Sequence, residues 1–498
     1  MIQFSSDDYS TLKSTLLEMW VPIVGVHTPA DLWTKNYVKA FCSIVKMDNF
    51  PTALQNKMKR TNEEFCKRSV FKTNFQSFFD TQPPFQLSEA ILTGSLSEGL
   101  FLYSLEPPDM DIMCVLKNIT FSQEDQKNGS LQLREDTPFV YAFVTKKETQ
   151  QLWGEFFYDV GTQAGKHRLS SRKLKEKLQD NYQKTSRMFH TMGEEELEQI
   201  NEGAAATVRK PKPSLSSFQY FVEIFQKLLR QPVNELYNLH IDRSQFHDDM
   251  LYQLVPSSDI VLSIYCEGWP SCAREWMTRE RLWPQIHSVE KITQSGFHIV
   301  PKSSSDGDFR LSFSGAESML IETLLPLQHR VMRAFKAVVK YHENTWSPNL
   351  KDIISSYHLK TIAFWHFEKS SQKSWTEETL VHHLVTLLQE FAEALRIQNL
   401  PMYFMPKFNL LQDVDDPEVT LDLMEKISQL AHNFSAISEA VHNCNTLKLL
   451  FATASDHYNL ANIFVTLREE KLKKAQENCE VSFTFYDVFV AMEKLVNR

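Results

Sequence analysis

The 498-residue sequence lacks any long apolar run, and no stretch approaches the roughly 18 consecutive apolar residues that a membrane-spanning helix needs. Its first residues, MIQFSSDDYSTLKS, contain no basic segment followed by an apolar one. We therefore expect neither a signal peptide nor a membrane partner. The chain also lacks an excess of positive charge. Its formal net charge is −9, which is unusual for a constitutive nucleic-acid-binding protein, although local basic patches can override the net value.

Cysteine is sparse and scattered. The seven cysteines form an odd set without regular spacing, which predicts buried thiols in a reducing, cytoplasmic compartment rather than a disulfide framework. Only CEGWPSC brings two of them close, Cys266 and Cys272. Because no second pair follows at zinc-ligand spacing, this segment does not indicate a metal site.

The order of apolar patterns predicts an α+β protein of more than one domain. Helical spacing dominates up to residue 80 and again from about 315, with long amphipathic stretches at 315–342, 376–396 and 419–440. Between them, AILTGS, MDIMCVL, PFVYAFV, GEFFYDV and SSDIVLSIYC resemble short strands. LSSRKLKEKLQDNY (169–182) predicts a helix capped by Ser170, with Leu174, Leu178 and Tyr182 on its buried face.

Two aspartates one residue apart stand inside a strand pattern, in DMDIMCVL (109–116). Residues i and i+2 of a strand share a face, so Asp109 and Asp111 present two carboxylates together while Met110 and Ile112 anchor the other face. Such a pair repels in a partly dry site unless a divalent cation lies between the carboxylates. Mg²⁺ suits this role because it retains open positions for water and substrate phosphate.

A Gly-Ser turn precedes these aspartates, in ILTGS. Gly94 has no Cβ, so backbone N–H groups can approach a phosphate, and the hydroxyls of Thr93 and Ser95 can donate to its oxygens. A phosphate turn combined with Asp-x-Asp predicts metal-assisted nucleotidyl transfer. Asp259, which opens the next apolar strand, is the candidate third ligand. Taken singly, Asp-x-Asp usually indicates a solvated strand edge, and Asp259 alone would indicate an aspartate that faces water at the start of a strand.

With these residues identified, the sequence resembles the metazoan cyclic GMP–AMP synthase-like receptors of the male-abnormal superfamily of nucleotidyltransferases. The matching pieces occur in order over roughly residues 88–410: LTGSLSEG, DMDIMCVL, RLSSRKLKEKL, SSDIVLSIYCEGWP, FHIVPKS, FRLSFSGAE and SSYHLKTIAFWH. The resemblance implies a bilobal fold with a mixed β-sheet catalytic lobe and a helical C-terminal lobe. It divides the chain into an N-terminal helical segment with a spine helix (1–80), a catalytic core (81–310, with a loop or insertion at 209–250), a helical lobe (311–410) and a helical extension without an assigned role (411–498).

The resemblance also implies residue roles. Asp109, Asp111 and Asp259 would be catalytic and bind two Mg²⁺ or Mn²⁺ ions. Nucleotide would be contacted by Thr93, Gly94, Ser95, Arg310, Ser312, Ser314, Glu317, Lys336, Ser356, Tyr357 and Lys360. A tyrosine ring suits base stacking and cations suit phosphate. From the residues alone, SSYHLKT indicates a helix start, with a serine cap and a core tyrosine, rather than a nucleotide site.

One feature of the vertebrate DNA-sensing synthase is missing. That enzyme carries a zinc-binding insertion of one histidine and three cysteines soon after the segment that matches RLSFS. Here the span from Glu317 to Lys336 contains no cysteine and only His329, so no zinc is expected. Because recognition of DNA by that enzyme depends on the insertion, double-stranded RNA is favoured over DNA as an activator.

Two basic clusters could bind such an activator. The first contains Lys57, Arg60, Lys67 and Arg68, and the second contains Lys166, Arg172, Lys173 and Lys177. Rows of cations on a helix follow phosphates with salt-sensitive affinity. Interspersed glutamates such as Glu63, Glu64 and Glu176 fit the alternative of a solvated helix face.

The sequence thus predicts a Mg²⁺-dependent, ligand-activated nucleotidyltransferase. From ATP, GTP or both it would make a cyclic dinucleotide for a STING-type receptor in innate immunity. Two other classes of function stay open. One is a catalytically silent scaffold of the same superfamily, and the other is a constitutive or RNA-extending nucleotidyltransferase.

Overall fold

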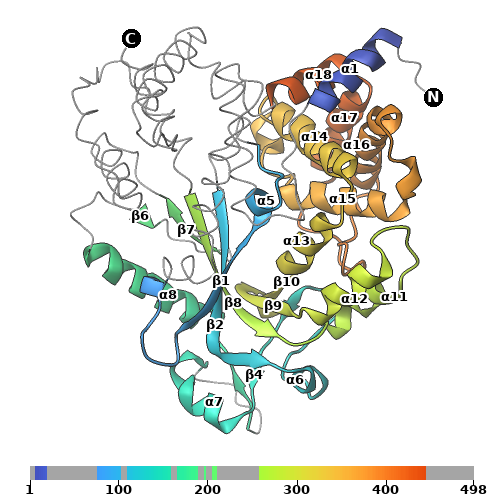
Figure 1. Cartoon of the computed structure of the whole chain (residues 1–498). Helices are drawn as coiled ribbons and strands as arrows, with labels where there is room; N and C mark the ends of the chain where they lie inside the picture. Colours follow the sequence, from blue (N-terminus) through green and yellow to red (C-terminus); the bar gives the residue numbers. More distant parts are fainter. Residues whose placement is uncertain are drawn as a thin grey trace, which may run out of the picture.

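The computed structural model describes residues 6–18, 76–102, 109–158, 165–188, 196–197, 205–209, 257–414 and 416–444. Figure 1 shows a twisted sheet next to a group of helices, α13 to α18. We call the sheet and the elements around it the sheet lobe, and the described residues from 313 onward the helical lobe. The predicted α+β class is confirmed. No helix in the described part of the chain is long and apolar enough to span a membrane.

The main sheet has eight strands in the described part of the chain, ordered β1-β2-β8-β9-β10-β3, with β7 paired to β8 and β6 to β7. Their bounds are β1 (Leu87–Thr93), β2 (Asp109–Phe121), β3 (Phe139–Val140), β6 (Glu196–Leu197), β7 (Ala205–Arg209), β8 (Ser257–Cys266), β9 (Phe297–Ser304) and β10 (Gly307–Ser312). β2 and β8 are parallel, and the other pairings are antiparallel. A separate pair joins β4 (Phe143–Val144) to β5 (His167–Arg168).

The centre of the sheet is apolar because β2 and β8 are in register. Ile112 faces Ile260, and Cys114 faces Leu262. All four residues are at most 2% exposed. The interior placement of Ile112 agrees with the prediction that it anchors the strand opposite the aspartates. Burial of this layer holds the polar ends of the two strands side by side.

Helices also pack around the sheet. They are α5 (Gly94–Ser97), α6 (Gln123–Lys127), α7 (Lys147–Leu152), α8 (Ser171–Met188), α11 (Arg274–Thr278) and α12 (Ile286–Gln294), with 3-10 turns η1 (Gln76–Phe78), η2 (Gly154–Phe156) and η5 (Ser271–Ala273). The predicted helix at 169–182 is confirmed as α8. Ser170 Oγ accepts from Lys173 N at 3.3 Å, and Leu174, Leu178 and Tyr182 are at most 4% exposed.

The helical lobe contains α13 (Ser314–Glu322), α14 (Pro326–Glu343), α15 (Ser356–Lys369), α16 (Leu380–Arg396), α17 (Pro417–Ala431) and α18 (Phe434–Asn443), with turns η6 (Pro348–Leu350), η7 (Gln372–Ser374) and η8 (Glu377–Thr379). α1 (Ser6–Glu18) packs on this lobe beside α18 (Figure 1), with Leu12 and Leu16 fully buried. The Arg330 guanidinium donates to the carbonyls of Leu16 and Leu17 at the end of α1.

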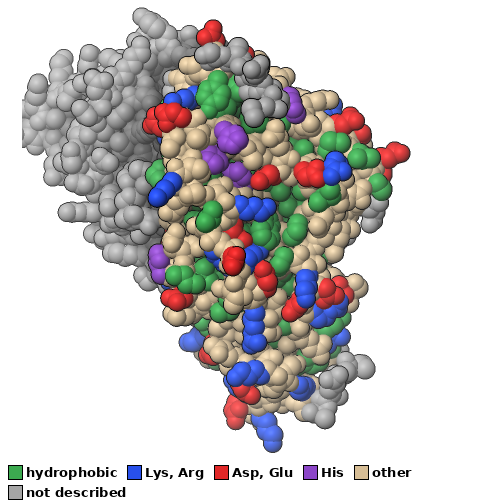
Figure 2. Space-filling model, turned by 90° about the vertical axis from the view of Figure 1, so that its right-hand side faces the viewer, with side chains coloured by type: hydrophobic (Ala, Val, Ile, Leu, Met, Phe, Trp, Pro, Cys, Tyr) green, Lys and Arg blue, Asp and Glu red, His purple; other side chains and the backbone are tan. Residues whose placement is uncertain are grey.

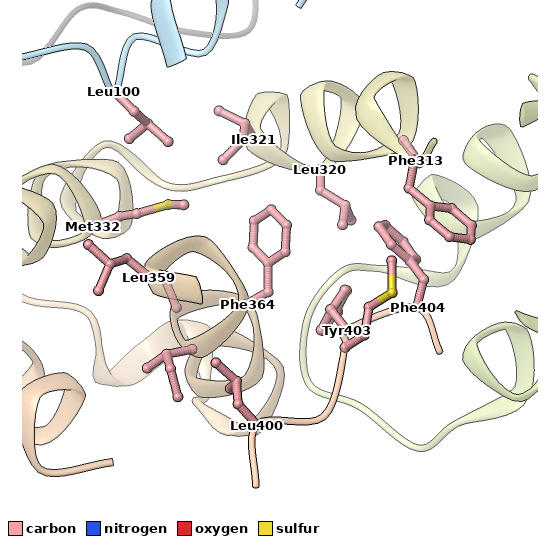
Figure 3. Close-up of a cluster of buried hydrophobic side chains, with 14 of the residues drawn as sticks. Leu100, Phe313, Leu320, Ile321, Met332, Leu359, Phe364, Leu400, Tyr403 and Phe404 are labelled. Carbon is pink, nitrogen blue, oxygen red and sulfur yellow. The ribbon is translucent and has the colours of Figure 1, made fainter. Parts of the chain in front are cut away.

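Apolar side chains join the two lobes. In Figure 3, Leu100, which follows α5, points toward Ile321 of α13 and Met332 of α14, and Phe313, Phe404 and Tyr403 continue the same cluster. Leu100 is 4% exposed, and the Phe313 and Phe404 rings stack at 4.7 Å between centroids. The chain after the Gly-Ser turn is therefore anchored among helices that lie more than 200 residues later in the sequence.

Three sequence predictions on elements need correction. GEFFYDV is not a strand, because Phe156 and Phe157 are both buried and η2 turns the chain so that both adjacent rings face inward. The stretch 315–342 is two helices, since Pro326 has no N–H to continue α13 and instead starts α14. Likewise 419–440 divides at Asn433, whose side chain accepts from Ala436 N and caps α18. Residues 19–75 and 210–256, which include most of the predicted spine segment and insertion, lie outside the described residues.

Candidate active site

Gly94 brings a backbone turn directly against a carboxylate. Its φ is +74°, a conformation that favours glycine, and a Cβ at this position would lie 1.8 Å from Asp111 Oδ2. The turn is closed by Glu98 N donating to Gly94 O at 3.1 Å and Leu100 N donating to Ser95 O at 2.9 Å. Residue 94 must therefore be glycine for two reasons: the positive φ of its backbone and the closeness of the Asp111 carboxylate.

The pairing of three strands gathers the polar residues on one face. Thr93 of β1 pairs with Asp111 of β2, and Asp111 pairs with Asp259 of β8. Paired residues in adjacent strands point the same way, so Asp111 and Asp259 share a face next to the turn. The Thr93 hydroxyl is buried and donates to Asp111 O at 3.3 Å, which fixes the end of β1.

These carboxylates fit a divalent cation. Asp259 Oδ1 is buried and has no hydrogen-bond partner among the described residues, which is costly for a carboxylate oxygen unless a cation or water satisfies it. The backbone of Asp109 pairs with Ser257, which keeps it in phase with Asp111, but its side chain lies outside the described set. Asp111 and Asp259 are the two members of the predicted triad whose side chains are described. No group of three residues that could hold a metal ion is found among the described side chains.

The predicted nucleotide-contacting residues of the other half come from β10, α13 and α15. Arg310 lies on β10, and the Ser312 and Ser314 hydroxyls are 3.1 Å apart where that strand leads into α13. Tyr357 is in the first turn of α15, partly exposed. Burial and then the charge of Glu317 raise the pKa of Tyr357, so its ring carries a neutral phenol at physiological pH. The structure thus places Arg310, Glu317 and Tyr357 near one another.

The start of α15 also matches its simpler interpretation. Ser355, rather than Ser356, caps the helix, with its hydroxyl accepting from His358 N at 3.3 Å. Ser356 is the first helical residue and is partly exposed. A capped helix N-terminus and a stacking surface on Tyr357 are compatible, because Tyr357 packs against the core while remaining partly exposed.

Lys360 is held between two carboxylates. Its Nζ is 2.7 Å from Glu98 Oε2 and 2.9 Å from Glu317 Oε2, and the three side chains are at most 12% exposed. Burial lowers the pKa of Lys360, but the charges of Glu317 and Glu98 outweigh it and raise the pKa above its ordinary value. Burial raises the pKa of the Glu98 carboxyl against the effect of Lys360 and the nearby Lys336. Lys336 itself is 6% exposed.

Comparison with known proteins agrees with this arrangement. The Mab-21 protein nucleotidyltransferase domain model matches residues 102–323, and the Mab-21 protein HhH/H2TH-like domain model matches residues 328–429. The two matches together cover more than half of the chain. The chain belongs to the Mab-21 family. The nucleotidyltransferase domain match thus takes in most of the sheet lobe together with α13, and the C-terminal domain match covers the helical lobe from α14 through most of α17.

Individual relatives carry different names. The chain is 27% identical to protein mab-21-like 3 of Danio rerio over 36% of this chain and 44% of that protein. It is 24% identical to the cyclic GMP-AMP synthase of Mus musculus over 42% of this chain and 46% of that enzyme. It is 31% identical to a cyclic GMP-AMP synthase-like receptor of Magallana gigas over 32% of this chain and 28% of that protein. The matched segment spans less than half the length of each relative.

Sequence reasoning missed two residues of this Mab-21 site. Glu98, which bonds Lys360, stood in the quoted LTGSLSEG without being selected. Lys302 of β9 was likewise present in FHIVPKS; burial and then the charge of Arg310 lower its pKa. Neither Lys302 nor Arg310 has a hydrogen-bonding or ion-pairing partner among the described residues. The signal that could have identified Lys302 was its place in FHIVPKS, as a lysine at the polar end of an apolar strand.

The predicted activating patch is only partly described. Lys57, Arg60, Lys67 and Arg68 lie outside the described residues. The other four have acceptors within the chain: Lys166 Nζ donates to Asn128 O, Lys173 Nζ to Phe157 O, Arg172 pairs with Glu176 and Lys177 with Asp80. Figure 2 views the molecule from the right-hand side of Figure 1, away from α8, and on that face cations and carboxylates are interspersed. A polyanion at α8 would compete with these internal contacts.

Proposed function

We propose that this Mab-21 protein is a divalent-metal-dependent nucleotidyltransferase that joins nucleoside triphosphates into a cyclic dinucleotide. The observation that carries the proposal is the contact of the Gly94 turn with Asp111, next to Asp259, whose buried Oδ1 has no hydrogen-bond partner among the described residues. A scaffold without catalysis has no need for this contact, which tolerates only glycine at position 94.

Each half of the site would have its own task. Asp109, Asp111 and Asp259 would hold two Mg²⁺ or Mn²⁺ ions, which supply Lewis-acid stabilisation of charge on phosphate oxygens. The N–H groups of the turn and the Ser95 hydroxyl would orient the triphosphate. Arg310 and Lys302, which have no ion-pairing or hydrogen-bonding partner among the described residues, would bind the phosphates of a second nucleotide, and Ser312 and Ser314 would donate hydrogen bonds to it. The Tyr357 ring would stack on a base, a contact of about 1–3 kcal/mol.

The chemistry is phosphoryl transfer. A ribose hydroxyl of one nucleotide attacks the α-phosphorus of the other, a new P–O bond forms, the bond to the β-phosphate oxygen breaks, and pyrophosphate leaves with its electron pair. The hydroxyl proton passes to solvent or to an aspartate carboxylate whose negative charge is not already compensated. Repetition on the linear intermediate closes the ring.

The product and its control follow the named relatives. Two matched relatives are a cyclic GMP-AMP synthase and a cyclic GMP-AMP synthase-like receptor. On this basis the proposed substrates are ATP and GTP. The proposed trigger, a polyanion such as double-stranded RNA at the basic clusters, and the proposed reader of the product, a STING-type receptor, come from the resemblance of the sequence and not from these names. The mab-21-like 3 relatives favour one other candidate, a scaffold that binds nucleotide without turnover.

Radiolabelled ATP and GTP with Mg²⁺ or Mn²⁺ test the proposal. Wild type is incubated without ligand, with long double-stranded RNA and with double-stranded DNA. The Asp111→Asn/Asp259→Asn double variant is the catalytic control, and Glu124→Gln, which changes an exposed carboxylate on α6, is the matched control. A phosphatase-resistant product from wild type and Glu124→Gln, absent in the double variant, supports the proposal. Its dependence on RNA identifies the trigger. Folded wild type that binds nucleotide but forms no product with any ligand supports the scaffold.

A further inference from the structure

Glu98 connects the phosphate turn to the helical lobe through its side chain. The residue follows α5 by one position, and its carboxylate is 1% exposed. It contacts Lys360 of α15 at 2.7 and 2.8 Å from its two oxygens, and Lys360 in turn contacts Glu317 of α13. One ammonium group therefore links the turn to α13, at the end of the nucleotidyltransferase match, and to α15 of the C-terminal domain match.

The backbone at the same place is held by a third helix. His329 Nε2 of α14 donates to Glu98 O at 2.8 Å, and Arg333 Nη1 donates to Gly99 O at 3.0 Å. Leu100, the next residue, is buried against Ile321 and Met332 (Figure 3). Three consecutive residues thus leave the turn bound to the helical lobe by an ion pair, two hydrogen bonds and an apolar side chain.

We propose that Glu98 is a positioning residue, which transmits the placement of the helical lobe to the Gly94 turn. A single closed turn of backbone connects Gly94 to Glu98, because Glu98 N donates a hydrogen bond to Gly94 O at 3.1 Å. A shift of α13 or α15 that moves Lys360 therefore moves Gly94 against Asp111. This inference rests on the proposed function, because it names the reaction that the turn serves.

Because of the charges around it, Glu98 can be neutralised without loss of the fold. Lys360 has two carboxylate partners, so a neutral glutamine at position 98 leaves the pair Lys360–Glu317 intact and the ammonium still compensated. Lys336, whose charge also acts on Glu98, stays in place. We therefore expect Glu98→Gln to keep the fold and lose the charged link. Glu98→Asp keeps the charge on a side chain one methylene shorter, and should give an intermediate result.

Two measurements test the proposal on the full chain, with Glu124→Gln as the matched control. The first is hydrogen exchange of nucleotide-free protein, followed at the amides of residues 94–102 and, for comparison, of β2 and α16. The second is dinucleotide synthesis with ATP and GTP, from which kcat and KM are taken. A misplaced turn harms the transition state more than ground-state binding, so we expect kcat to fall at least about tenfold while KM changes less than about threefold.

The outcomes are distinct. Faster exchange confined to 94–102 in Glu98→Gln, with the split in kcat and KM, supports the proposal. Exchange and kcat equal to wild type overturn it. Faster exchange across the whole molecule with a lower urea midpoint also overturns it, because the residue is then only structural. If wild type makes no dinucleotide with any ligand, the proposed function fails, and the exchange data alone decide whether Glu98 holds the turn.

Discussion

Gly94 and Asp111 are so close that a Cβ on the glycine would lie 1.8 Å from a carboxylate oxygen of the aspartate. This contact brings a phosphate-binding turn and a metal-binding strand together through two residues separated by 17 positions in the chain. The first two predictions below concern this contact and its neighbour Asp259, and the others concern the rest of the site and the stability of the fold.

Replacing Gly94 with alanine should abolish synthesis, because the new methyl group displaces the Asp111 carboxylate and the positive φ is strained. We expect a loss of at least about 100-fold in kcat/KM and about 1–3 kcal/mol in the free energy of unfolding. Gly154→Ala is the matched control, since nothing lies within 4 Å of a Cβ there. Equal activity of Gly94→Ala and wild type would show that the turn does not act as described.

Asp259→Asn should remove binding of Mn²⁺ while leaving the metal-free fold intact, because the amide lacks the charge that a cation needs and relieves repulsion with Asp111. Thermal unfolding with and without Mn²⁺ measures this. Wild type should gain stability with rising Mn²⁺ concentration as mass action requires, and Asp259→Asn should not. Asp306→Asn, at an exposed ion pair with Arg134, should respond like wild type.

Tyr357→Leu should weaken nucleotide binding by about 1–3 kcal/mol, because a branched aliphatic side chain offers no ring for a base to stack on. Tyr357→Phe keeps the ring and should bind nearly as wild type does. Equilibrium dialysis with labelled ATP and GTP measures both variants. A large loss in the phenylalanine variant would assign the role to the hydroxyl rather than to the ring.

Lys360→Met should be strongly destabilising, because it leaves the buried Glu98 and Glu317 carboxylates without their shared cation. We expect a loss of about 3–5 kcal/mol in the free energy of unfolding by urea, with partial recovery in the Glu98→Gln/Lys360→Met double variant. Arg396→Met breaks an exposed pair with Glu393 and should cost less than about 1 kcal/mol. Similar losses in the two single variants would mean that burial does not set the strength of the inner pair.

Stability should fall as the pH drops from about 6.5 toward 4. Burial lowers the pKa of His329 to about 4, whereas the unfolded chain takes up its proton near 6.5. The depressed pKa means that the stability is present above pH 6.5 and is lost on acidification, by at most about 3 kcal/mol for this residue. His298, His358 and His383 add to the loss with the same sign. Urea midpoints should depend less on pH in His329→Gln than in wild type. In His287→Gln, a change at an exposed site, their dependence on pH should equal that of wild type.

The local sequence was enough to predict those elements that depend on residues close together in the chain. The buried stripe of Leu174, Leu178 and Tyr182 predicted α8, and strand periodicity predicted that Asp109 and Asp111 share a face of β2. Such patterns depend on residues within a few positions of one another. The same local view failed at Phe156 and Phe157 and at Pro326, where the packing of both adjacent rings and a missing N–H overrode the wider pattern.

The sequence by itself determined the strand, the turn and the types of side chain that suit metal and phosphate. Only the tertiary structure decided that Asp259 lies beside Asp111, because the register of β2 on β8 depends on the apolar layer that the whole sheet buries. It also decided that Lys360, 262 positions from Glu98, meets that carboxylate. A charged pair in the interior forms only where distant helices exclude water from both groups, and no spacing along the chain encodes that exclusion.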